Sequence, residues 1–165
     1  MSKKSFSLYS DDLGGSFSKN QVMDKFGCSG GNTSPHLRWE NAPEGTKSFA
    51  LTLHDPDAPT DSGFWHWAVF NLPANTNELP AGAGDPASNL LPGSAFMGQA
   101  DTGNKAYDGP CPPEGDFRHR YILTVYALNT DTPEIDADTP LAQAIFKISM
   151  MYELERASLI AYFKK

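Results

Sequence analysis

Long hydrophobic runs are absent from this sequence of 165 residues. The longest unbroken apolar stretch is the five residues from Leu159 to Phe163, whereas a helix that spans a bilayer needs about 20. Residues 1–15 also lack the apolar stretch of roughly 7–15 residues that a secretory signal peptide contains. We therefore expect no membrane span and a cytoplasmic protein. A periplasmic or secreted protein is the alternative if a signal peptide has been removed.

Basic residues are few and scattered along the chain. The sequence has 13 Lys and Arg against 20 Asp and Glu, which gives a formal net charge of −7 at pH 7. Domains that bind nucleic acid usually carry a clustered basic face, so no nucleic-acid partner is expected. An anionic ligand would have to be held by local hydrogen-bond donors, because the overall charge repels it.

Branched aliphatic residues are scarce as well, with three Val and five Ile against 10 Phe, 6 Tyr and 3 Trp. The 14 Gly and 13 Pro indicate many loops. An apolar share of 39% is enough to build a sizeable core, which argues against disorder. No repeat or low-complexity linker divides the chain, so we expect one domain over residues 1–165, with a core of aromatic residues, Leu and Ala.

Hydrophobic alternation predicts several strands. Ser48–Asp55 alternates as a half-buried strand does, while Phe64–Leu72 and Arg120–Leu128 are apolar on both faces. Shorter strands are expected within Ser5–Ser10 and at Leu159–Phe163. The long segment Pro73–Gly115 is rich in Gly and Pro and shows no periodicity, so we expect an irregular loop there.

One late helix is expected at about 140–157. Thr139 is a candidate N-cap and Pro140 suits the first helical position. Apolar residues then recur at helical spacing: Leu141, Ile145, Ile148 and Tyr152. Because strands dominate and the helix comes late, the pattern predicts a mainly β protein, an antiparallel β-sandwich with one appended helix.

Three short motifs are candidates for a functional site. In Asp55-Pro56-Asp57-Ala58-Pro59 an extended chain would point both carboxylates to one side, whereas a turn would bond them to nearby amides. His66 and His119 are either satisfied core residues or ligand contacts. Gly109–Gly115 holds three prolines in four residues, which suits a stiff pocket rim or a rigid connector.

No activated nucleophile accompanies these motifs. Cys111 lies between two prolines, and neither a Ser-x-x-Lys nor a Gly-x-Ser-x-Gly motif occurs. Covalent catalysis therefore lacks a candidate, and we expect no catalytic residue. The two His and two Asp of the motifs leave open a divalent metal site or an acid–base pair acting on a phosphoester.

In this order and spacing, the segments Asp55–Pro59, His66, Gly109–Pro113 and His119–Tyr121 resemble the phosphatidylethanolamine-binding protein family, also called the Raf kinase inhibitor family. Asn32–Trp39 and Trp65-His66-Trp67 are similar to its short bacterial branch. The resemblance covers nearly the whole chain. It implies an antiparallel β-sandwich with a small anion-binding pocket near the surface.

The resemblance also implies which residues would contact the ligand. Asp55, His66, His119 and Tyr121 would make polar contacts, and the prolines would form walls. The full implied set is Asp55, Asp57, Pro59, His66, Gly109, Pro112, Pro113, His119 and Tyr121. The donors would be the two histidines, the tyrosine hydroxyl and free amides near Gly109 and Cys111. Asp55 and Asp57 would hold a histidine in its donor form.

The function implied by the resemblance is non-enzymatic binding of phosphate or phosphorylated head groups, with regulation of a kinase or protease as an extension of it. The alternative is a metal-dependent or acid–base phosphoester hydrolase that uses the same His/Asp pocket. No cofactor or metal is expected, and the resemblance implies a homodimer and a protein partner. Histidine titration predicts tighter anion binding at about pH 5.5–6 than at pH 8.

Cys28 and Cys111 are the only cysteines. In a cytosolic chain the expectation is two free thiols. The resemblance adds the alternative of a Cys28–Cys111 disulfide, because bacterial relatives carry cysteines at both places.

Overall fold

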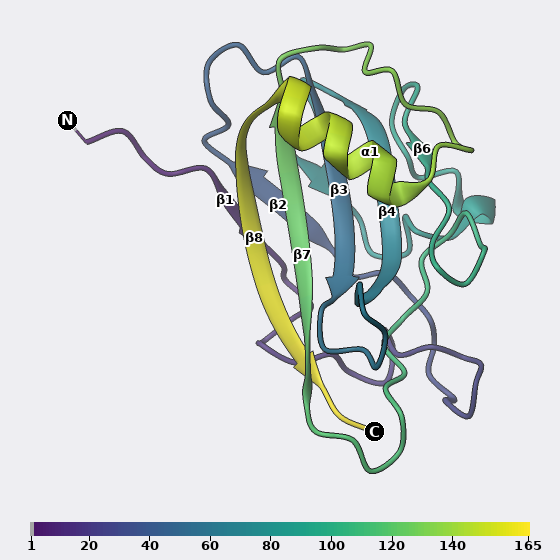
Figure 1. Cartoon of the computed structure of the whole chain (residues 1–165). Helices are drawn as coiled ribbons and strands as arrows, with labels where there is room; N and C mark the ends of the chain where they lie inside the picture. Colours follow the sequence, from purple (N-terminus) through teal and green to yellow (C-terminus); the bar gives the residue numbers. More distant parts are fainter. Residues whose placement is uncertain (1) are drawn as a thin grey trace.

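Two antiparallel β-sheets packed face to face form the body of the protein in the computed structural model, which describes residues 2–165 (Figure 1). The larger sheet has the strand order β6-β4-β3-β7-β8 and the smaller one β1-β2-β5. The bounds are β1 Ser7–Tyr9, β2 Leu37–Glu40, β3 Ser48–Asp55, β4 Phe64–Pro73, β5 Glu78–Leu79, β6 Phe96–Met97, β7 His119–Leu128 and β8 Glu153–Phe163. The predicted mainly β sandwich with one late helix is confirmed.

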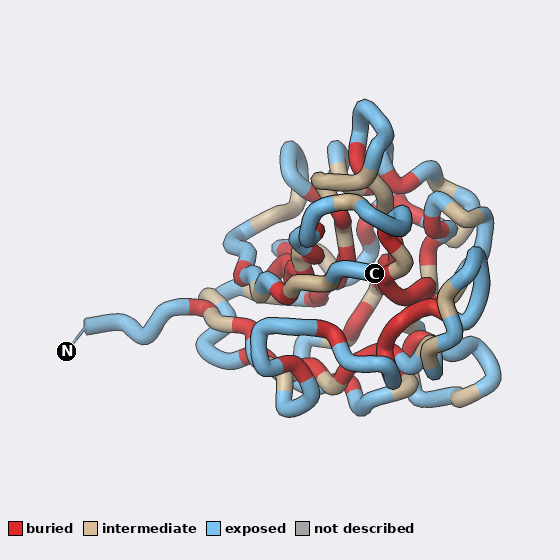
Figure 2. The backbone as a smooth tube through the Cα atoms, turned by 90° about the horizontal axis from the view of Figure 1, so that it is seen from below, coloured by how far each residue is buried: buried red, intermediate tan, exposed pale blue. Residues whose placement is uncertain are grey.

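The main core lies between the two sheets and rests on Leu and aromatic residues. Leu37 and Trp39 of the small sheet pack in one cluster with Leu51, Leu53 and Trp67 of the large sheet. Seen from below in Figure 2, buried segments run through the interior and exposed loops surround them. The scarcity of Val and Ile is thus met by larger side chains that span the space between the sheets.

A second apolar cluster lies on the outer face of the large sheet, where helix α1 (Leu141–Lys147) covers it (Figure 1). Ala50 of β3 packs there with Leu141 and Ala144 of the helix. Strand β3 is therefore buried on both faces, and Thr52 in its polar phase is only 1% exposed. The strand was predicted correctly, but the prediction that one of its faces is exposed was wrong. The sequence of β3 does not indicate that a distant helix covers this face.

The helix is shorter than predicted. Helix α1 continues as the π-helical turn η2 (Ile148–Tyr152), and β8 begins at Glu153, so residues 153–157 of the predicted helix are strand. Glu, Leu, Arg and Ala favour helices, but here they pair with β7, whose edge would otherwise leave backbone groups without partners. Pro140 is the N-cap; the hydroxyl of the predicted cap, Thr139, bonds Asp136 instead.

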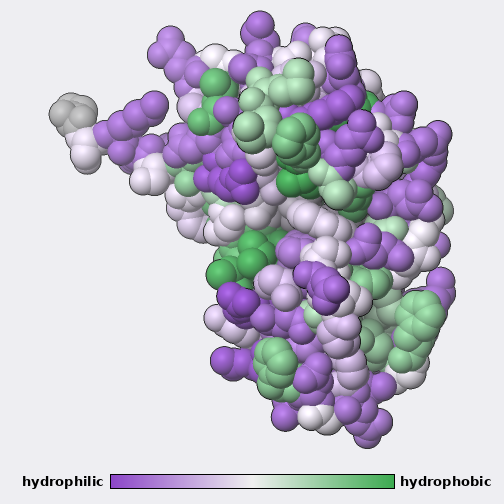
Figure 3. Space-filling model, in the orientation of Figure 1, coloured by the Kyte–Doolittle hydropathy of each residue, from purple (hydrophilic) through white to green (hydrophobic). Residues whose placement is uncertain are grey.

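The outward side of the helical segment leaves apolar side chains in solvent. Phe146 is 64% exposed and Met150 is 70% exposed. Figure 3 shows the same face, where apolar residues over α1 lie among hydrophilic ones. No helix among residues 2–165 is long and apolar enough to cross a membrane.

The segment 73–115 is less irregular than predicted. It contributes β5, the short 3-10 helix η1 (Pro86–Ser88) and β6. Strand β2 was also not predicted. These strands have two to four residues, too few to show an alternation of polar and apolar side chains, and their pairing to β2 and β4 is decided by the assembled sheets.

Candidate functional site

A cavity of about 450 Å³ opens at one end of the large sheet. Asp55 is the last residue of β3, His66 lies near the start of β4, and His119 is the first residue of β7. Because β3 runs antiparallel to both neighbours, its end meets their beginnings. The fold thereby brings together the predicted site residues that line this cavity: Asp55, Pro59, His66, Pro112, Pro113, His119 and Tyr121.

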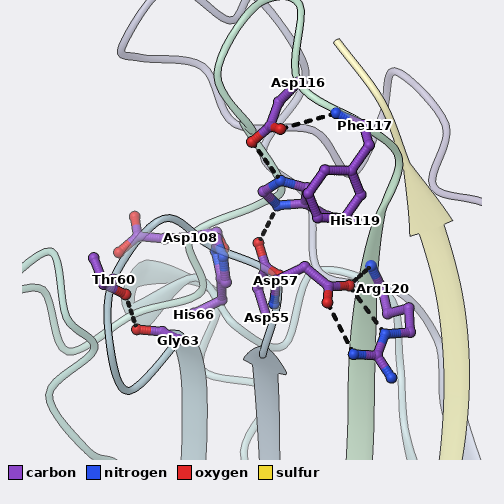
Figure 4. Close-up of polar contacts among 10 residues, drawn as sticks. All are labelled: Asp55, Asp57, Thr60, Gly63, His66, Asp108, Asp116, Phe117, His119 and Arg120. Atoms are coloured by element: carbon purple, nitrogen blue, oxygen red, sulfur yellow. Dashed lines mark hydrogen bonds and ion pairs between the residues drawn. The ribbon is translucent and has the colours of Figure 1, made fainter.

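His119 lies between two carboxylates (Figure 4). Its Nδ1 is 2.7 Å from Asp55 Oδ2 and its Nε2 is 3.0 Å from Asp116 Oδ2. Burial lowers the pKa of His119, but the bonds to Asp55 and Asp116 outweigh it, so the pKa lies above the ordinary histidine value. The bond to His119 in turn lowers the pKa of Asp116. His119 therefore brings positive charge to the cavity, while both of its nitrogens already have partners.

Asp57 lies outside the cavity lining. Its backbone N–H donates to Asp55 Oδ1 at 2.9 Å, so the Asp-Pro-Asp segment forms a turn rather than an extended strand. Its carboxylate accepts bonds from Arg120 Nε and Nη2 at 3.0 and 2.8 Å, which lower the pKa of Asp57 to about 2. Of the two alternatives for this segment the structure has the turn, because the strand ends at Asp55.

Gly109 supports the cavity without lining it. A side chain here would place a Cβ 2.0 Å from the carbonyl oxygen of Gln21, so only glycine permits this close approach of two backbones. Its N–H donates to Asn32 Oδ1 at 2.8 Å. The amide of Gly109 expected as a ligand donor is therefore engaged within the protein.

His66 is held by a backbone carbonyl. Its Nδ1 lies 2.8 Å from the carbonyl oxygen of Asp108, and the residue is 5% exposed. Burial lowers the pKa of His66 below the ordinary value, although Asp108 and Asp55 act against this. His66 and His119 therefore have opposite pKa shifts within one cavity.

The hydroxyl of Tyr121 is buried, and it has no hydrogen-bond partner within residues 2–165. Burial and the nearby carboxylate of Asp55 raise the pKa of Tyr121, so the hydroxyl keeps its proton. The ring packs edge-on against His66, with centroids 5.4 Å apart. Tyr121 thus brings a protonated hydroxyl to the lining of the cavity, close to the carboxylate of Asp55.

The walls of the cavity are largely apolar. One lining residue, Cys111, forms a disulfide with Cys28. Met23, Phe26 and Phe64 line the cavity beside the prolines. The disulfide joins two segments that are 83 residues apart in the sequence and fixes the loop that carries Phe26 against the proline wall.

A family model described as phosphatidylethanolamine-binding protein matches residues 14–164. The chain belongs to the phosphatidylethanolamine-binding protein family. It is 42% identical over 158 residues to the UPF0098 protein YbhB of Escherichia coli K12, covering 94% of this chain and 98% of the relative. It is 46% identical over 136 residues to the UPF0098 protein YbcL of the same organism, covering 81% and 74%.

Solved structures of the family have the same fold. The crystal structure of E. coli YbcL, described as a member of the mammalian family, superposes with a TM-score of 0.93 at 40% identity and covers 97% of this chain and 98% of that chain. A putative phosphatidylethanolamine-binding protein homologue, CT736 of Chlamydia trachomatis, gives a TM-score of 0.80 at 27% identity, covering 97% of both chains.

Sequence reasoning missed several residues that build the site of this phosphatidylethanolamine-binding family member. Asp116 precedes His119 by three residues and Arg120 follows it, so both could have been found as neighbours of a site histidine. The carbonyl of Asp108 gives no signal in a sequence, because every residue has one.

Nowhere in residues 2–165 do three or more His, Cys, Asp or Glu side chains form a group that could hold a metal ion.

Proposed function

We propose that the chain is a non-enzymatic binding protein for small oxyanions, namely phosphate and phosphorylated head groups. The observation that carries the proposal is the hydroxyl of Tyr121, which is buried in the cavity without a partner. Leaving a buried polar group unpaired costs about 1–3 kcal/mol. An anionic oxygen that accepts its proton would recover that cost.

The charge on His119 supports the same proposal. The raised pKa of His119 favours a positive charge beside the cavity. The apolar walls formed by Phe26, Phe64 and the prolines suit a small organic group attached to the anion. The family's name agrees with a phosphorylated head group as the ligand.

The hydroxyl and thiol groups of the cavity lining support binding rather than covalent catalysis. The hydroxyl of Thr60 donates to the carbonyl of Gly63, and the hydroxyl of Thr102 donates to Asp108. The sulfur of Cys111 is in the disulfide. Each of these groups is committed to a partner within the protein.

Calorimetry with phosphate and with phosphoethanolamine tests the proposal. We expect Tyr121→Phe to weaken binding about tenfold, since one hydrogen bond to a charged acceptor is lost. Tyr126→Phe is the matched control, because Tyr126 lies on the same strand but belongs to the cluster on the opposite face. Affinity should also fall between about pH 6 and pH 8 as His119 loses its charge. No binding by the wild type, or equal binding by Tyr121→Phe, contradicts the proposal.

A further inference from the structure

Helix α1 covers only part of the outer face of the large sheet (Figure 1). Towards the other end of this face, one row of side chains crosses four strands in register. His54 is paired with Trp65 on one side and with Ile122 on the other. Ile122 is paired in turn with Ile160. Their neighbours along β7 and β8 belong to the core between the sheets, so the row faces outward. The outer face therefore has a raised half, formed by the helix, and an uncovered half, formed by the strands.

Both halves of the outer face expose apolar side chains. On the raised half, Phe146 and Met150 are largely exposed, and their spacing of four residues places them on one side of the helical segment. On the uncovered half, Ile160 is 42% exposed. Figure 3 shows apolar groups over α1 and again lower on the same face. Apolar area that is exposed over one face is typical of a protein–protein interface.

The two ends of the outer face carry opposite charges. The loop between β7 and α1 holds four acidic residues at the raised end: Asp131, Glu134, Asp136 and Asp138. At the uncovered end, Arg118 precedes β7 and Lys164 follows β8. The guanidinium of Arg118 lies 4.4 Å from the ring centre of Tyr162, an outward-facing residue of β8. No salt bridge within residues 2–165 engages Arg118, Lys164, Asp131 or Glu134, so their charges are available to another molecule.

Several other charges near the two ends are engaged within the chain. At the raised end, Lys105 pairs with Asp138, and Lys147 donates to a backbone carbonyl of the acidic loop. At the uncovered end, Arg120 pairs with Asp57. The contrast between an acidic raised end and a basic uncovered end is therefore carried by the exposed residues that lack such partners.

We propose that the outer face of the large sheet is an interface between two copies of this chain. A two-fold axis that lies in the interface and runs across the strands places α1 of each copy over the uncovered half of the other. The same rotation brings the acidic loop of each copy to the basic end of the other, so the charge contact forms twice. The face is thus complementary to itself in shape and in charge, which is the property of a closed, isologous dimer. The dimer does not depend on the proposed anion binding.

Sedimentation velocity of the wild type tests the association itself. Mixed apolar and charged contacts are typical of interfaces whose partners also exist apart. We expect a Kd of about 10 µM, with mostly dimer at about 100 µM and mostly monomer at about 1 µM. The unfolding of a single chain is therefore measured at the lower concentration.

Apolar contacts on the two halves of the face are tested separately. Phe146→Asp on the raised half and Ile160→Asp on the uncovered half should each weaken association at least about tenfold, because a charge would be buried between the copies. Tyr9→Asp is the matched control. Tyr9 is 39% exposed, close to the value for Ile160, but it belongs to the small sheet on the opposite side of the sandwich.

An exchange of charges tests the relative orientation of the two copies. Asp131→Lys/Glu134→Lys makes both ends of the face basic, and Arg118→Glu/Lys164→Glu makes both ends acidic. Each double variant alone should be monomeric at about 100 µM, because like charges meet twice. An equimolar mixture of the two should form a dimer of unlike chains, because each end then meets its opposite. A misfolded variant cannot produce this recovery.

The outcomes decide the inference as follows. It is overturned if the wild type is monomeric at about 100 µM, or if it is dimeric and Phe146→Asp and Ile160→Asp associate as tightly as Tyr9→Asp. A mixture of the charge variants that associates no better than either alone overturns the proposed orientation. Loss of the dimer in the single apolar variants, with recovery in the mixture, supports the interface.

Discussion

Burial acts on the two histidines of the cavity in the same direction, and their partners decide the result. Removal from water disfavours the charged ring in both. His119 has two carboxylates as partners, so its charged form is favoured. His66 has a neutral carbonyl, so burial prevails. The cavity therefore holds one histidine that keeps a charge and one that resists it.

These opposite shifts predict a maximum of folding stability near pH 6.5, the ordinary histidine value. The raised pKa of His119 stabilises the fold below about pH 6.5, and this contribution is lost as pH rises through the raised value. The lowered pKa of His66 stabilises the fold above about pH 6.5, and this contribution is lost as pH falls towards the lowered value. Urea unfolding between pH 5 and 8 measures both slopes.

Single variants assign the two slopes. His119→Gln should flatten the alkaline side and His66→Gln the acid side. The lowered pKa values of Asp57 and Asp116 act only below about pH 4, outside this window. A profile that rises or falls steadily across the window contradicts the assignment.

Asp116 should control the charge of His119. Asp116→Asn keeps the shape of the side chain but removes the carboxylate from Nε2, so the pKa of His119 should fall. An NMR titration of the imidazole measures it. Glu114→Gln is the control, since it removes a carboxylate from the same exposed loop. Equal titration curves for the two variants would mean that the contact with Asp116 does not raise the pKa of His119.

At the scale of elements, helix α1 makes the large sheet a buried layer. The helix contributes Leu141 and Ala144 to the outer cluster, and β3 gains its second buried face from them. A seven-residue helix is too short to be stable alone in water, so its stability must come from this packing.

Leu141→Ala should lower the free energy of unfolding by about 2–4 kcal/mol, because it removes a buried side chain and leaves a cavity. Phe146→Ala on the same helix should change it by less than about 0.5 kcal/mol, because Phe146 is largely exposed. Denaturant unfolding of both variants measures the difference. Similar losses in the two would contradict the packing of α1 on the sheet.

At the scale of the whole molecule, the disulfide connects the segment before β2 to the loop before β7. It closes a long loop of the unfolded chain, with cysteines 83 residues apart. The chain-entropy model gives about 4.5 kcal/mol for a loop of this length. The double variant Cys28→Ser/Cys111→Ser should lose stability of that order in urea unfolding.

The bridge itself is tested by intact mass. Without reductant the mass should lie about 2 Da below the reduced value, since two hydrogens are lost when the bond forms. With reductant present, the wild type and the double variant should be equally stable. An unchanged mass, or a double variant as stable as the oxidised wild type, contradicts a stabilising disulfide.

Much of the fold was predictable because its longest strands carry a strong local pattern. Ser48–Asp55 was predicted with its observed bounds, and β7 was predicted to within one residue. The residues after Tyr152 were predicted as helix because their local propensities favour one. Pairing with β7 is a non-local contact, and a local pattern does not report it.

The sequence by itself determined a β-sandwich, the segments that carry the site and the proline walls, since these depend on residue type and short-range alternation. Only the tertiary structure decided which side chains meet. In the folded chain Asp57 pairs with Arg120, and Asp116 bonds His119. The carbonyl of Asp108 accepts a hydrogen bond from His66. These contacts decide which side chains of the cavity favour a proton and a charge, because a pKa depends on the burial and neighbours that folding creates.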